Sequence, residues 1–215
     1  MKLLFGHVAL CSRPDEMEII NDENISGAIW DRKLNDELER QMRQLRVRLK
    51  NSKDLATNFW PESPVPEIFI LEHLKKSYLG GYIKEAGLYG LASDIKLLAD
   101  LFARISGKTS LSVNLDYSTK NGLGNFHVDN PRLRLVTTYF GLGSQWLPNQ
   151  ILDLDALVKK GDVIYPLNNY QAMIQTVQSG QVLILKGRDS YDSGGLSLAH
   201  GVPVTSESRF RLMIN

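Results

Sequence analysis

The chain has 215 residues, of which 43% are hydrophobic and 23% charged, and its formal net charge is +1. This composition is ordinary for a globular protein. A charge so close to zero gives no long-range attraction to nucleic acid or anionic lipid, so we expect no nucleic-acid partner. No apolar stretch approaches the roughly 18 residues that span a bilayer, so we expect no membrane partner either.

The single cysteine, Cys11, cannot form an internal disulfide bond, which favours a reducing, cytoplasmic location. Residues 1–11 are apolar and carry only Lys2. They lack the charged region and cleavage site of a signal peptide, and we predict a strand there. The length suits one domain over 1–215, with a mainly helical part at 1–107 and a strand-rich part at 108–215.

The first predicted helix covers residues 31–51. Its apolar residues recur in steps of three and four, which places them on one stripe of a helix: Leu34, Leu38, Met42, Leu45 and Leu49. The remaining positions carry charges of both signs, which is typical of a solvated face. A nucleic-acid role is the weaker interpretation of its arginines, because Glu37 and Glu39 dilute them: Arg40, Arg43, Arg46 and Arg48.

Two further helices are predicted before residue 108. The second runs over residues 67–79 and ends at the Gly80-Gly81 pair, since glycine commonly ends helices. The third begins near Ser93, a residue type that caps helix N-termini, and Gly107 closes it.

From residue 111 the apolar period changes to two, which indicates strands. We predict strands at 111–117, 133–140, 172–177, 182–185 and 209–214, a turn at 120–124 and a glycine-rich loop at 187–195. Helices followed by strands favour an α+β fold with a barrel or sandwich.

The strand-rich part holds two histidines, and the first belongs to an H-x-D motif, His127-Val128-Asp129. Residues two apart on an extended backbone point to the same side, so both side chains can reach one ion. A barrel could bring His200 across to complete a triad. Two histidines and one carboxylate form the facial triad of non-haem Fe(II) oxygenases, although zinc binds the same ligands with water in a fourth position.

The last predicted strand places Arg209 and Arg211 on one face, because side chains alternate along a strand. The apolar residues of the other face would pack on the helices: Phe210, Leu212 and Ile214. A buried guanidinium needs an anionic partner, and its fork of donors matches a carboxylate. A dicarboxylate such as 2-oxoglutarate would satisfy it, with the keto-acid end on the metal. The alternative is a pair of rim arginines in surface salt bridges.

Phe126-His127-Val128-Asp129-Asn130-Pro131, followed by the strand at 134–139, resembles the Fe(II)/2-oxoglutarate-dependent dioxygenases of the prolyl hydroxylase type. The resemblance implies a double-stranded β-helix (a cupin or jelly-roll-like barrel) with the N-terminal helices packed on one sheet. It implies that His127, Asp129 and His200 bind Fe(II) and form the catalytic centre of a hydroxylase of unknown substrate, a protein or a small molecule. It also implies that Arg209, nine positions after His200, or Arg211 binds 2-oxoglutarate.

A resemblance over nearly the whole chain is to the DUF1826 family, whose function is unknown. It rests on five segments: Ile29–Arg32, Phe126–Tyr139, Trp146–Asn149, Gly180–Gly187 and Ala199–Pro203. This sequence departs from the family pattern before the H-x-D motif, where Gly124-Asn125 stands in place of Cys-Pro-Arg. Two other functions stay open: a non-catalytic zinc- or iron-binding protein for metal homeostasis or sensing, and a cupin-like enzyme that uses its metal as a Lewis acid.

Several other residues have structural and functional interpretations. For Tyr139 and Trp146, core packing is favoured over a pocket wall. Asn114 and Asp116 share one face of a strand and could line the pocket or face solvent. His7 and His73 have no partner at motif spacing, and we expect both to be structural.

Overall fold

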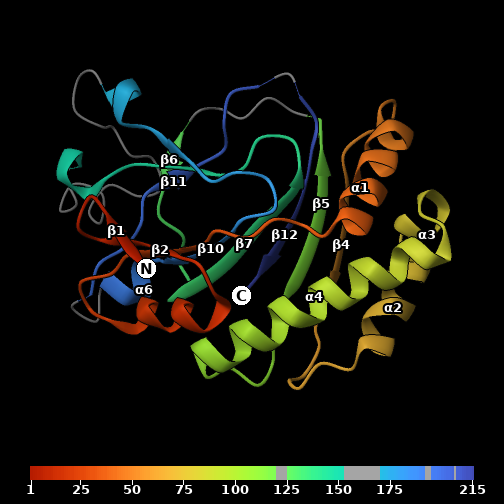
Figure 1. Cartoon of the computed structure of the whole chain (residues 1–215), viewed down its shortest axis with the longest axis horizontal. Coiled ribbons are helices and arrows are strands. Elements are labelled where there is room, and N and C mark those ends of the chain that lie inside the picture. The colour runs from red at the N-terminus through yellow and green to blue at the C-terminus, as the bar shows by residue number, and fades with distance from the viewer. Residues whose placement is uncertain (120–124, 153–169, 192–194, 206) are drawn as a thin grey trace.

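The computed structural model describes residues 1–119, 125–152, 170–191, 195–205 and 207–215. In these segments the protein is a mixed α+β fold built on a large sheet (Figure 1). The sheet has eight strands in this order: β1 (Lys2–Leu4), β2 (Val8–Cys11), β3 (Gly27–Trp30), β10 (Val182–Lys186), β7 (Leu133–Phe140), β12 (Arg209–Ile214), β5 (Val113–Ser118) and β4 (Leu55–Phe59).

A second sheet in the described segments has four strands of two residues each, in the order β6 (Phe126–His127), β11 (His200–Gly201), β8 (Gln145–Trp146) and β9 (Gln175–Thr176). The chain passes between the two sheets several times. β5, β7, β10 and β12 belong to the large sheet, and β6, β8, β9 and β11 to the small one. All strand pairs within this part are antiparallel.

Three long helices and the short α3 lie on the side of the large sheet away from β6 and β11 (Figure 1). The long helices are α1 (Asp36–Leu49), α2 (Glu67–Lys76) and α4 (Glu85–Ser106), and α3 covers Leu79–Tyr82. Short helical segments complete the described chain: η1 (Pro14–Asn21), η2 (Asn149–Ile151), η3 (Tyr170–Met173) and α6 (Arg188–Tyr191). None of the described helices combines the length and apolar character that crossing a bilayer requires.

Two apolar cores cover the two faces of the large sheet. On the helix side, Met42 of α1 and Phe102 of α4 join Leu212 of β12 in the larger cluster. On the other side, Val136 of β7 and Leu183 of β10 pack with Trp146 of the small sheet. The large sheet is therefore sandwiched between the helices and the small sheet.

The predicted alternation of the last strand is confirmed. Phe210, Leu212 and Ile214 are fully buried in the helix-side core. Because β12 pairs regularly with β5, Arg209 and Arg211 point to the opposite face, toward the small sheet.

Most long predicted elements match the structure, but three helix ends differ. The first helix begins at Asp36, because the Asn35 side chain caps it by accepting from the Leu38 amide, so Leu34 lies before the helix. The second helix ends at Lys76, where the Ser77 backbone becomes extended and the Ser77 hydroxyl donates to the Leu74 carbonyl at 2.8 Å, and Gly80-Gly81 lies inside α3. The third helix begins at Glu85, so Ser93 lies within it and donates to Glu67 at 2.6 Å rather than capping. Gly107 does end this helix, in a left-handed conformation.

Strands differ more than helices. β3 and β4 arise inside the mainly helical part, where we predicted no strand. The strand predicted at 172–177 shrinks to Gln175–Thr176 after a 3-10 turn, and one helical turn, α6, interrupts the loop predicted at 187–195. The turn predicted at 120–124 lies outside the described residues.

Candidate metal centre

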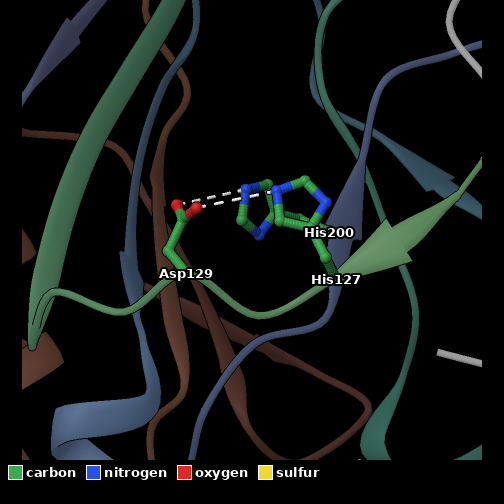
Figure 2. Close-up of side chains that lie close together, drawn as sticks. All are labelled: His127, Asp129 and His200. Atoms are coloured by element: carbon green, nitrogen blue, oxygen red, sulfur yellow. Dashed lines mark ion pairs between the residues drawn. The ribbon is translucent and has the colours of Figure 1, made fainter. Parts of the chain in front are cut away.

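Pairing between β6 and β11 brings the two distant histidines side by side. His127 is directly opposite His200 in the antiparallel register, and their ring centroids are 4.5 Å apart. Asp129 follows two residues later, on the segment that leads from the small sheet into β7. Figure 2 shows the three side chains converging on one point.

The distances suit a shared ion. Asp129 Oδ1 is 3.6 Å from His127 Nε2, and Oδ2 is 3.3 Å from His200 Nε2. One ligand atom from each residue can be chosen so that all lie within 4.8 Å of one another. The structure thus brings together the three residues that the sequence singled out as metal ligands.

The Asp129 carboxylate is buried, with 7% of its side chain exposed, whereas His127 is 36% exposed. The contact to His200 has the distance of an ion pair but not the geometry of a hydrogen bond, and Oδ2 has no hydrogen-bond partner among the described residues. A buried carboxylate oxygen without a partner is costly unless something else satisfies it. Oδ2 is therefore available as a ligand atom.

Two opposing effects set the pKa of Asp129. Burial, the largest single effect, raises it, but contacts with His127 and His200 and the charge of Arg134 together outweigh burial and hold the pKa far below its usual range. The carboxylate is ionised at neutral pH, as a metal ligand must be.

The sequence analysis did not identify Arg134, which contacts the predicted triad. Its Nη1 lies 2.6 Å from Asp129 Oδ1, and its Nε donates to Asn215 Oδ1 at 2.6 Å. The sequence did contain a signal for this contact: Arg134 is a charged residue within the apolar run Leu133–Phe140, and a cation in a buried strand needs an anionic partner.

Two glycines allow the backbone to approach the centre closely. A Cβ on Gly187 would lie 2.4 Å from the Asp129 carbonyl oxygen, and one on Gly201 would lie 2.7 Å from that of Asn125. The Arg188 amide also donates to the Asp129 carbonyl at 2.7 Å. Gly187 and Gly201 thus allow their segments to approach the backbone next to the triad residues.

Arg209 and Arg211 have different surroundings despite sharing a face. Arg211 Nε lies 2.6 Å from Asp116 Oδ1 on β5. Arg209 is 5% exposed, and its Nε and Nη1 have no hydrogen-bond partner among the described residues. Burial and the charge of Arg211 lower the pKa of Arg209 to about 10, although Asp116 partly opposes them. Arg209 is therefore not an exposed rim residue, whereas Arg211 is partly exposed and forms a salt bridge, as the alternative interpretation expects.

The remaining singled-out side chains have structural partners. Trp146 is buried opposite His200 in the small sheet. The Tyr139 hydroxyl donates to Asp94 at 2.8 Å on the helix side, and Asn114 bonds to Asn58 of β4.

The two other histidines also lie in structural contacts. His7 is buried, with Nδ1 2.6 Å from the Ser26 hydroxyl and Nε2 accepting the Asn149 amide at 3.1 Å. His73 stacks on Phe59. These contacts give both rings a role in packing and hydrogen bonding.

A cavity of about 550 Å³ lies between α1 and the end of β7. Met42, Tyr139 and Phe140 line it, and none of the three triad residues does. It is therefore a separate feature from the triad.

Comparison with known proteins gives one family match. The model of the family described as protein of unknown function (DUF1826) matches residues 11–215. No curated protein matched the sequence.

Several solved structures are similar to the chain. A rice dioxygenase for auxin oxidation has 11% identity and a TM-score of 0.48 over 97% of this chain and 81% of that one. A Trichoplax adhaerens prolyl hydroxylase, solved with a hypoxia inducible factor peptide, has 11% identity and a TM-score of 0.46 over 94% and 87%. A Pseudomonas putida prolyl-4-hydroxylase has 10% identity and a TM-score of 0.43 over 94% and 97%. Likenesses at this level do not by themselves assign an activity to the chain.

Proposed function

This chain belongs to the DUF1826 family, and we propose that it is an Fe(II)- and 2-oxoglutarate-dependent dioxygenase that hydroxylates a protein or small-molecule substrate. The observation that carries the proposal is the cluster of two histidines and one carboxylate with ligand atoms within 4.8 Å of one another. His127, Asp129 and His200 would be the metal ligands and the catalytic centre.

The donor set fits ferrous iron. Two imidazole nitrogens and one carboxylate occupy one face of an octahedron and leave open positions for other ligands. The unpartnered Oδ2 of Asp129 and the ring nitrogens around it offer a place for a cation. A bound ferrous ion supplies the redox chemistry that couples decarboxylation of 2-oxoglutarate by dioxygen to oxidation of a substrate C–H bond.

The finer fold assignment belongs to this proposal. Strands β5 to β12 divide between two facing sheets in the orders β10-β7-β12-β5 and β6-β11-β8-β9. We assign this arrangement to a double-stranded β-helix whose small sheet carries both histidines. We also propose that 1–215 is one domain, because β1 to β4 from the part at 1–107 belong to the same large sheet.

Arg209 supports 2-oxoglutarate as the cosubstrate. Its guanidinium is buried on the face toward the small sheet and has two nitrogens without hydrogen-bond partners in the described chain. A bidentate carboxylate would satisfy both the charge and the donors. Arg211 already has this partner in Asp116, so we assign the remote carboxylate of 2-oxoglutarate to Arg209. The keto-acid end would then lie toward the triad.

The residues divide the work of the reaction. His127 and His200 would each bind the metal through a ring nitrogen, and the low pKa of Asp129 keeps its carboxylate charged at neutral pH. Arg209 orients the cosubstrate, and the apolar packing around Trp146 limits water on the sheet side of the centre. A cytoplasmic location, expected from the lone cysteine, stays a prediction.

The test starts with anaerobic loading of Fe(II) and elemental analysis. We expect about one metal per chain, lost in His127→Ala and Asp129→Ala variants, and succinate formation from 2-oxoglutarate on admission of oxygen. A loaded protein that neither binds nor turns over 2-oxoglutarate would refute the dioxygenase proposal. If the protein holds zinc or iron tightly but neither binds nor turns over 2-oxoglutarate, the result would support a non-catalytic metal-binding protein.

A further inference from the structure

One oxygen of the buried Asp129 carboxylate is already held, and the other is not. Oδ1 lies 2.6 Å from Arg134 Nη1, and Oδ2 has no hydrogen-bond partner within the described segments. We propose that Arg134 is a positioning residue that fixes this carboxylate, so that Asp129 binds the metal through Oδ2 alone. The inference rests on the metal centre of the proposed function and adds a residue to it.

Arg134 is itself fixed from the opposite side. Its Nε donates to Asn215 Oδ1 at 2.6 Å. Asn215 extends the β12–β5 ladder, because its backbone and that of Ser112 exchange two hydrogen bonds of 2.9 and 3.0 Å. The guanidinium therefore spans from a rigid sheet position to the metal ligand, with one donor on each.

This arrangement constrains how the carboxylate can bind a metal. A free carboxylate can rotate and use both oxygens, which consumes a coordination position that a cosubstrate would need. With Oδ1 bound to a planar, charged donor, rotation would break a charge-assisted hydrogen bond. Holding Oδ1 preserves an open position.

Replacing Arg134 tests the proposal, because repulsion and positioning predict opposite changes in metal affinity. A guanidinium near a divalent cation also repels it, so if repulsion dominated, removing Arg134 would strengthen metal binding. If positioning dominates, binding weakens. Loss of partners that hold metal ligands typically weakens metal affinity by about 10- to 100-fold, and we expect that range for Arg134→Met.

The experiment titrates Co(II), a spectroscopically visible substitute for Fe(II), into wild type, Arg134→Met, Arg134→Lys and Asn215→Ala. We expect Arg134→Met to bind about 10- to 100-fold more weakly and to show a changed visible absorption band, because a second oxygen can now coordinate. Arg134→Lys restores the charge and one donor, and should recover part of the affinity. Asn215→Ala should shift both readouts in the direction of Arg134→Met, by less.

Arg132 provides the matched control. It is an exposed arginine two residues before Arg134 and has no described contact with the carboxylate. Arg132→Met removes the same charge from the same segment, and should leave Co(II) affinity and spectrum unchanged.

Four outcomes would overturn the inference. The first is an Arg134→Met protein that binds Co(II) as tightly as wild type, or more tightly, with the wild-type spectrum. The second is an equal loss in Arg132→Met, which would show that the loss does not depend on the contact with Asp129. If Arg134→Met does not fold, an Arg134→Lys protein with wild-type affinity and spectrum refutes the proposal. A wild type that binds no Co(II) refutes the metal centre as well, which separates the two failures.

Discussion

Replacing Arg209 with methionine should change stability and cosubstrate binding in opposite directions. The guanidinium is 5% exposed and lacks partners for two nitrogens among the described residues. Burial and the charge of Arg211 lower its pKa to about 10, and at 1.36 kcal/mol per pH unit this corresponds to roughly 3 kcal/mol against the charged form. Relaxation of the surroundings reduces that cost, so we expect the ligand-free variant to be about 1–3 kcal/mol more stable.

The same substitution removes the proposed partner of the remote carboxylate. Truncating one member of a buried charge pair typically costs about 2–5 kcal/mol in binding, which is roughly a 30-fold to several-thousand-fold loss of 2-oxoglutarate affinity. Urea unfolding of the metal-free protein measures the first effect. Calorimetric titration of 2-oxoglutarate into the Co(II)-loaded protein without oxygen measures the second.

Arg211→Met is the matched control, because it occupies the same face but breaks the contact with Asp116. It should destabilise the ligand-free protein and leave more 2-oxoglutarate affinity than Arg209→Met does. The reasoning is refuted if Arg209→Met destabilises the ligand-free protein, or if it binds 2-oxoglutarate like wild type. The anchor assignment is wrong if Arg211→Met causes the larger affinity loss.

Three other substitutions test individual contacts, one beside the triad and two elsewhere in the fold. Gly187→Ala places a Cβ 2.4 Å from the Asp129 carbonyl oxygen, so Co(II) affinity should fall with stability; unchanged affinity would contradict this. Asp94→Asn weakens the buried ion pair with Arg32 and should cost up to about 3–5 kcal/mol in urea unfolding; a loss below about 1 kcal/mol would count against it. Burial lowers the pKa of His7, so the unfolded chain takes up its proton first. Stability should therefore fall as pH drops below about 6.5, and a His7→Gln protein with an equally steep melting-temperature decline would argue against His7.

Long periodic segments were predictable from the sequence. The apolar stripe of α1 and the residue ranges 133–140 and 209–214 matched the structure, because many residues repeat one period and bury one face. The alternation of β12 also placed its arginines correctly, since a strand that buries Phe210 and Leu212 must turn Arg209 and Arg211 the other way.

Short elements were not predictable in the same way. β6, β8, β9 and β11 have two residues each, too few to show any period, and they exist because neighbouring strands pair with them. β3 and β4 lie in a part dominated by helical pattern, and their partners β10 and β5 are distant in sequence. Tertiary pairing decided these strands.

The sequence by itself determined which side chains could bind a metal: the H-x-D spacing places His127 and Asp129 on one side of an extended chain. Only the tertiary structure decided that His200 lies opposite His127, because that register comes from pairing between β6 and β11. It also decided the partners of the arginines. Asp116 neutralises Arg211 from a neighbouring strand, Arg134 reaches Asp129 across a turn, and Arg209 stays buried without a described partner. Charge compensation in a core depends on which strands are adjacent, and local sequence patterns do not carry that information.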